Sequence, residues 1–64
     1  MDLNTAPNIP DPDGFYEELR AAHDGLSMSE SGALHARLVL VLSNHIGDRE
    51  VLRQAIEAAK RAGR

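Results

Sequence analysis

The sequence predicts an all-α protein, either a small three-helix bundle or a helical hairpin plus one helix, preceded by an extended N-terminal arm. Apolar residues recur at helical spacing in three segments, and glycines and capping residues mark the ends of those segments. The apolar run LVLVL, residues 38–42, would by itself fit a strand. It lies, however, within a longer segment that keeps the helical register.

Residues 1–12 form the predicted arm. They include Pro7, Pro10 and Pro12, and each proline pushes the residue before it toward an extended conformation. We expect this arm to be flexible, and residues 13–64 to form the three-helix domain. A chain of 64 residues makes one domain at most, and without cysteine no disulfide can stabilise it.

The first helix is expected over residues 13–24. One face of this segment carries mainly apolar and aromatic side chains: Phe15, Tyr16, Leu19, Ala22 and His23. Gly25 supplies the left-handed residue that commonly ends a helix, and the apolar Leu26 follows it.

The second helix is expected over residues 28–45. Ser27 and Glu30 have the spacing of a capping box, in which each side chain accepts a hydrogen bond from the other's backbone N–H. Its main apolar stripe ends on a histidine and comprises Leu34, Leu38, Val41, Leu42 and His45.

The third helix is expected over residues 49–62, with Asp48 as its N-cap. Its apolar stripe is the most regular of the three and comprises Val51, Leu52, Ala55, Ile56, Ala59 and Ala62. On the opposite face Glu57 has the spacing to pair with Arg53 and with Arg61.

The segment SNHIGD, residues 43–48, is interpreted as the junction between the second and third helices. Asn44 and His45 lie in the last helical turn, Gly47 is the left-handed stop, and Asp48 caps the next helix. Helix-end chemistry alone accounts for these residues. A protonated His45 would also suit the negative end of the helix dipole.

The three histidines do not predict a metal site within one chain. His35 and His45 lie on one helix, roughly 15 Å apart along its axis, whereas a zinc ligand lies about 2.0–2.1 Å from the metal. His23 is expected opposite the start of the second helix, so the three rings are placed at three different heights. The sequence also lacks cysteine, a nucleophile elbow and a glycine-rich phosphate loop. We therefore predict no cofactor, no metal and no enzymatic activity.

The back of the second helix carries small side chains where a solvent-facing helix would carry lysine or glutamate. We predict an interaction surface there, comprising Gly32, Ala36, Leu40 and Ser43. Together with the leucine-rich front, this surface predicts that the helix is covered on nearly every side, in part by a partner. Domains of this length usually need a disulfide, a metal or a partner chain. The expected partner is another protein or a second copy of the chain, as a homodimer.

Charge is distributed unevenly along the chain. The net charge is −3, with seven acids against one arginine in residues 1–30, and five basic residues against three acids in residues 48–64. The overall acidity argues against nucleic acid as a partner. The N-terminal segment does not have the pattern of a signal peptide, and the longest apolar run is too short to span a membrane, so a cytoplasmic location is expected.

A family resemblance is carried by FYEELRAAHDGLS, then ALHARLVLVLSNHIGD, then a short Ala-rich amphipathic helix. This pattern resembles a family of very short bacterial proteins catalogued as a domain of unknown function, over about residues 13–62. NHIGD after an aliphatic run is its most specific piece. The family has no assigned activity. Its members are often encoded near flavin-dependent aromatic hydroxylases and other catabolic enzymes, and the resemblance thus implies an accessory role.

Three functions follow as alternatives. The first is a non-catalytic helical interaction module, which associates with itself or docks on a larger enzyme. The second is a small helix-turn-helix regulator that faces DNA phosphates with basic residues of the third helix: Arg49, Arg53, Lys60 and Arg61. The third is an enzyme or metal carrier that uses His45 across a dimer interface. The acidic balance favours the first over the second.

Overall fold

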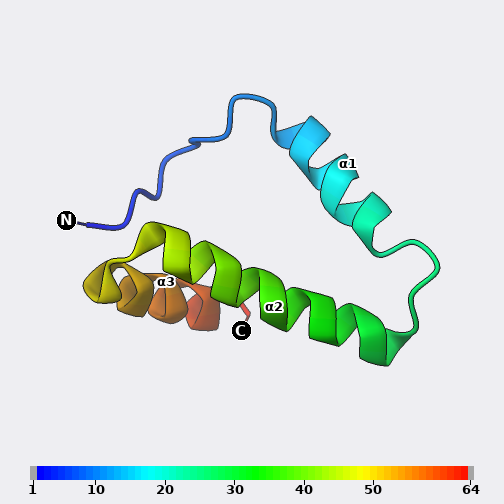
Figure 1. Cartoon of the computed structure of the whole chain (residues 1–64). Coiled ribbons are helices and arrows are strands. Elements are labelled where there is room, and N and C mark those ends of the chain that lie inside the picture. Colours follow the sequence, from blue (N-terminus) through cyan, green and yellow to red (C-terminus); the bar gives the residue numbers. More distant parts are fainter. Residues whose placement is uncertain (1, 64) are drawn as a thin grey trace.

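Three helices make up the regular structure of residues 2–63, the part of the chain that the computed structural model describes. They are α1 (Pro12–Ala22), α2 (Met28–Ile46) and α3 (Arg49–Ala62). Helices α2 and α3 fold back on one another as a hairpin, whereas α1 stands apart at the far end of α2 (Figure 1). The predicted all-α class is confirmed, in the form of a hairpin plus one helix. Met1 and Arg64, at the outer ends of the predicted arm and domain, lie outside the described residues.

Helix α1 begins one residue earlier and ends two residues earlier than predicted. Asp11 is its N-cap and accepts a hydrogen bond of 3.0 Å from the backbone N–H of Gly14. Pro12 then occupies the first turn, where its missing N–H costs nothing and its fixed φ suits a helix. At the other end the backbone N–H groups of His23 and Asp24 donate to the carbonyls three residues earlier, those of Arg20 and Ala21. The helix thus ends in a tight turn before Gly25.

Helix α2 begins as predicted and ends at Ile46, one residue later than predicted. The Oγ of Ser27 accepts from the N–H of Glu30 at 3.1 Å, and a Glu30 carboxylate oxygen accepts from the N–H of Ser27 at 2.9 Å. Both hydrogen bonds lower the pKa of the Glu30 carboxyl. The bond with the Ser27 backbone has the larger effect, and the bond with the Ser27 side chain has the smaller one. The capping box is therefore formed in full.

Helix α3 has the predicted bounds. One oxygen of Asp48 accepts from the backbone N–H groups of Glu50 and Val51, at 3.0 and 3.1 Å. Glu57 has the spacing to pair with Arg53 and Arg61, but among the described residues it forms an ion pair with neither. Arg53 forms a bidentate ion pair with Glu50, one turn toward the N-terminus, with a shortest distance of 2.6 Å. Glu57 lies 3.6 Å from the Lys60 ammonium.

The hairpin junction is built as the sequence predicts. Gly47 adopts a left-handed conformation with φ of 67° and donates its N–H to the carbonyl of Ser43 at 2.9 Å. Asp48 follows at once as the cap of α3. Two helices are thus joined by two residues, which fixes where α3 starts relative to α2.

Replacing Gly47 with alanine is expected to destabilise the protein by about 1–2 kcal/mol, because a Cβ is disfavoured at positive φ. Asparagine tolerates this conformation better, so Gly47→Asn is the matched control and should lose less. Urea unfolding of the three proteins at one chain concentration measures the difference. Equal stability of Gly47→Ala and wild type would contradict the assigned role.

The hairpin has almost no buried core. Among the described residues Val51 alone is buried, with 8% of its surface exposed, and it lies in the first turn of α3. Helix α1 does not pack on α2 or α3. The large apolar residues in the middle of α2 are open to solvent, with Val39, Leu40 and Val41 exposed by 61%, 69% and 64%. The cover that the sequence predicts for α2 is therefore not supplied within one chain.

Candidate interaction surface

The four residues of the predicted interaction surface lie on α2 in two different surroundings. Gly32 and Ala36 are exposed, and a Cβ built on Gly32 would have open space around it. Leu40 is exposed by 69%. Ser43 is half-buried and lines a groove shared with α3. Three of the four residues thus stay open to a partner, and the fourth belongs to the hairpin groove.

This groove runs between α2 and α3 and has a volume of about 370 Å³. Its lining is almost entirely apolar: Val39, Ser43, Leu52, Ala55, Ile56 and Ala59. Small side chains keep it open, while Val39 and Ile56 stand at its rim, each with 61% of its surface exposed. None of the six residues ionises, so the groove has no group suited to acid or base catalysis.

The exposed apolar surface extends well beyond the groove. Large apolar side chains are exposed along the whole chain: Ile9, Phe15, Tyr16, Leu26, Met28, Val39, Leu40, Val41, Leu42, Ile46 and Ile56. Single exposed apolar residues are ordinary, but contiguous apolar surface of this kind marks an interaction site in a natural protein. On α2 the residues from 39 to 42 are consecutive, so they expose apolar surface on several sides of the helix.

Helix α1 presents a second unpartnered surface. Phe15 and Tyr16 lie with ring centroids 5.8 Å apart, and their exposed fractions are 38% and 61%. Leu19, one turn further on, is half-buried. On the other side of this helix Arg20 pairs with Glu17 at 2.6 Å and with Asp24 at 3.3 Å. The helix is thus amphipathic, and its apolar side is only partly covered, with Tyr16 the most exposed of the three.

Two of the histidines come together, which the sequence analysis did not predict. The rings of His23 and His35 have centroids 4.5 Å apart, and His23 Nδ1 lies 3.0 Å from the Oγ of Ser31. The prediction of three separate heights was therefore wrong for this pair. His35 and Ser31 are four residues apart on one helix, and His23 reaches them because the turn at Gly25 is short. This spacing is the signal that could have identified the cluster.

Two residues of the predicted helix junction, Asn44 and His45, lie outside this histidine cluster. Both are exposed, in the last turn of α2.

Within residues 2–63 no group of three or more histidine, aspartate or glutamate side chains is arranged to hold a metal ion. Nor does any helix in that range combine the length and the apolar character needed to cross a membrane.

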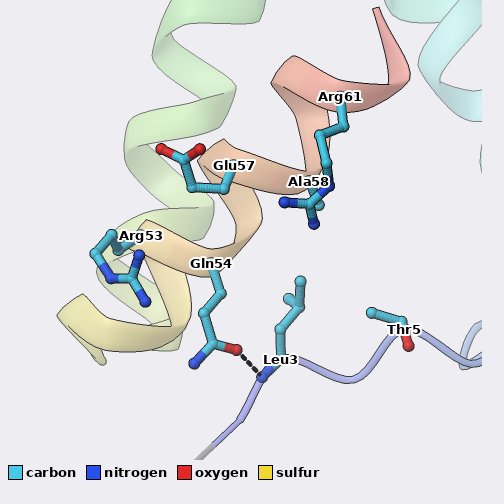
Figure 2. A pocket seen from close by; sticks show the side chains of 7 residues that line it. All are labelled: Leu3, Thr5, Arg53, Gln54, Glu57, Ala58 and Arg61. Atoms are coloured by element: carbon cyan, nitrogen blue, oxygen red, sulfur yellow. Dashed lines mark hydrogen bonds between the residues drawn. The ribbon is translucent and has the colours of Figure 1, made fainter.

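The N-terminal arm lies against α3. The backbone N–H of Leu3 donates to the side-chain oxygen of Gln54 at 2.9 Å (Figure 2). The side-chain amide of Gln54 in turn donates to Asp2 at 3.4 Å. Leu3 is half-buried at the edge of a pocket of about 280 Å³, whose other lining residues are Thr5, Arg53, Gln54, Glu57, Ala58 and Arg61. The arm thus covers the polar side of α3. The groove is lined by residues from the apolar side and stays open.

The electrostatics of α3 come mainly from pairs within the helix. Arg53, and to a lesser extent Gln54, lower the pKa of the Glu50 carboxyl by hydrogen bonding, and the same contact raises the pKa of Arg53. Both side chains of this pair are more than half exposed, so it contributes little to stability. The basic residues of α3 are therefore interleaved with acids and do not form an uninterrupted basic patch.

The exposed area of the whole chain exceeds that of a compact monomer. The chain exposes 5579 Å², whereas a compact protein of its 7.0 kDa would expose about 4,000 Å². Its radius of gyration is 13.4 Å, against about 11 Å for a compact domain of this length. The extended arm contributes part of the excess, and the separated α1 and the open groove contribute the rest.

Comparisons with known proteins give one match. A family model described as "Protein of unknown function (DUF2783)" matches residues 3–61 of the chain. No curated protein matches it. No solved structure matches it either.

Proposed function

The chain belongs to the DUF2783 family of proteins of unknown function, and from that premise we propose that it is a non-catalytic helical interaction module. In this proposal it works in the bacterial cytoplasm, either by self-association or as a small accessory subunit docked on a larger enzyme. A flavin-dependent catabolic enzyme is the kind of larger partner that the family resemblance implies.

The observation that carries this proposal is the exposed apolar surface of a chain in which, over residues 2–63, Val51 alone is buried. The excess of about 1,500 Å² over a compact monomer lies within the roughly 1,000–2,500 Å² that each chain loses in an obligate interface. Net stability is a small difference between large terms, so a domain that buries so little apolar surface gains much of its stability from a partner.

The non-catalytic part of the proposal rests on the lining of the grooves. The groove between α2 and α3 holds five apolar side chains and one serine. The pocket under the arm is open, and two of its polar lining residues already have partners: Arg53 pairs with Glu50, and Gln54 bonds to Leu3 and Asp2. Neither places a nucleophile beside a base.

The helix-turn-helix alternative gains no support from α3. Arg53 is held by Glu50 at 2.6 Å and Lys60 lies 3.6 Å from Glu57, so DNA phosphates would have to displace carboxylates from both. Asp48 and Glu50 also add negative charge to the first turn, the end of a recognition helix that contacts bases.

The proposal is tested by the stability of the protein as a function of its own concentration and of added host proteins. A self-associating module should sediment as more than one chain, and its melting temperature should rise with concentration because association stabilises the folded form. An accessory subunit should instead co-purify, untagged, with one enzyme in stoichiometric amount and melt higher in that complex. The proposal fails if the protein is a monomer with a concentration-independent melting temperature and migrates alone from its host extract.

A further inference from the structure

We propose that the groove between α2 and α3 is occupied by α1 from a second copy of the same chain, so that two chains exchange their first helices. This inference rests on the proposed function and names the partner for it. Each chain would contribute one helix and one groove, and the two contacts would be equivalent, as in a dimer with two-fold symmetry.

Helix α1 requires a surface that its own chain does not supply. It has 11 residues, and isolated helices shorter than about 12–15 residues are marginal in water. Its stability must therefore come from packing of its apolar side, which carries Phe15, Tyr16 and Leu19. The backbone of α1 does not approach α2 or α3 of the same chain closely, and Tyr16 and Phe15 on that side stay exposed by 61% and 38%.

The groove is suited to such a helix. Ser43, Ala55 and Ala59 are small and let another helix approach, while Val39 and Ile56 offer apolar contacts at the rim. On α2 the line through Val39 and Ser43 continues toward Ala36 and Gly32, which are exposed and small. A helix of 11 residues is about 16 Å long. The groove and its continuation along α2 can thus accommodate its whole length.

The opposite net charges of α1 and α3 favour α1 of a second copy as the occupant. Helix α1 carries Asp13, Glu17 and Glu18 against Arg20, a net charge of −2. Helix α3 carries four basic residues against Glu50 and Glu57, a net charge of +2. On a helical wheel Arg49 and Lys60 lie next to Ile56 at the groove rim. A helix of net negative charge would therefore dock beside a helix of net positive charge, although Lys60 and Glu17 already have partners within their own helices.

The connection between α1 and α2 holds α1 away from its own hairpin. His23 Nδ1 lies 3.0 Å from Ser31 Oγ, and the His23 ring packs beside His35. Leu26 donates its N–H to the carbonyl of His23 at 3.1 Å, around Gly25 with φ of 78°. These contacts lie at the end of α1 and do not involve Phe15 or Tyr16, so docking of α1 on a second copy would keep them.

The area argument agrees with an exchanged pair. In the exchanged pair, α1 of each chain docks in the groove of the other chain. The groove and the apolar side of α1 are therefore both covered in one dimer. The excess exposure of about 1,500 Å² per chain includes the extended arm, so it is an upper bound on the area of these two surfaces, and an obligate interface removes roughly 1,000–2,500 Å² from each chain.

Cross-linking between singly substituted chains tests the exchange directly, since the protein contains no cysteine. Tyr16→Cys places a thiol on the apolar side of α1, and Ile56→Cys places one at the groove rim. Both side chains are exposed by 61%, so neither change removes buried packing. The two variants are mixed, unfolded together, refolded and treated with a short bismaleimide linker. The mixed cross-linked species is then identified by mass spectrometry.

The matched control pairs Ile56→Cys with Met28→Cys, whose side chain is exposed by 95% at the start of α2. Thiols held near each other have effective concentrations near millimolar, so at micromolar chain concentration the Tyr16→Cys mixture should cross-link roughly a hundredfold faster than the control. Circular dichroism of each variant must match wild type, and Phe15→Cys replaces Tyr16→Cys if that variant does not refold.

The outcomes separate this inference from the proposed function. Preferential mixed cross-linking supports the exchange. A dimer whose two mixtures cross-link equally overturns the exchange but leaves the interaction module standing. A monomer that binds a different protein overturns the second copy as occupant in the same way. A chain carrying both Tyr16→Cys and Ile56→Cys that cross-links only within itself shows a closed monomer and overturns the exchange; if that monomer also migrates alone from its host extract, the proposed function is overturned as well.

Discussion

Ala36→Glu is expected to abolish association while the chain keeps its helical content. Ala36 is exposed on α2, and glutamate is a good helix former, so the substitution costs α2 itself little. Across an interface, however, the longer side chain blocks close helix approach and carries a charge out of water, which costs several kcal/mol unless the charge is paired. Sedimentation across a concentration series measures the loss.

Leu40→Ala gives a graded form of the same result. If a partner covers Leu40 fully, its truncation should weaken association by about 1–3 kcal/mol, or roughly 5- to 150-fold in the dissociation constant. Met28→Ala, at the most exposed large apolar residue, is the control and should leave association unchanged. If Ala36→Glu, Leu40→Ala and wild type all associate alike, the interface does not include this side of α2.

Val51→Asp is expected to open the α2–α3 hairpin. Val51 is the one buried residue among those described, so an aspartate there would place an unpaired charge in the only dry part of the fold. We expect a loss of about 3 kcal/mol or more, which a domain of this size cannot sustain. Val51→Ala removes two methyl groups and should cost roughly 1.5 kcal/mol.

The measurement is thermal unfolding followed by circular dichroism, at one chain concentration for all variants. Met28→Asp is the matched control, because it introduces the same charge at a position exposed by 95% in the first turn of α2, where an acid is favourable. A Val51→Asp protein that melts with wild type would show that the contact between α2 and α3 does not hold the fold together.

The helices and their ends were predictable from the sequence because local contacts determine them. Ser27 with Glu30, and Gly47 with Asp48, each satisfy backbone groups within four residues, so their patterns can be recognised without knowing the fold. The start of α1 was missed by one residue for a local reason as well. Asp11 caps this helix from before Pro12, and the prediction took the proline as part of the arm.

The arrangement of the helices was not predictable to the same degree. Helix α2 carries large apolar residues on several sides, so no single stripe indicates which side α3 contacts. Val39 and Ser43 line the groove with α3, whereas the main predicted stripe runs through Leu34 and Leu38. The docking of Leu3 on Gln54 joins residues 51 positions apart, and no local pattern marks such a contact. The sequence did place Gly32, Ala36 and Leu40 on open surface, but their partner stays a prediction.

The scarcity of long-range contacts in the single chain has a kinetic consequence. Nearly all of its contacts lie within one helix or at a helix end, and such contacts form on the timescale of helix–coil relaxation, roughly 0.1–1 μs for a short helix. Encounter of two protein surfaces is far slower, typically about 10⁵–10⁷ M⁻¹s⁻¹. At micromolar concentration a meeting of two molecules therefore takes roughly 0.1–10 s. If two chains associate as proposed, refolding should thus be second order, with a half-time that depends mainly on chain concentration.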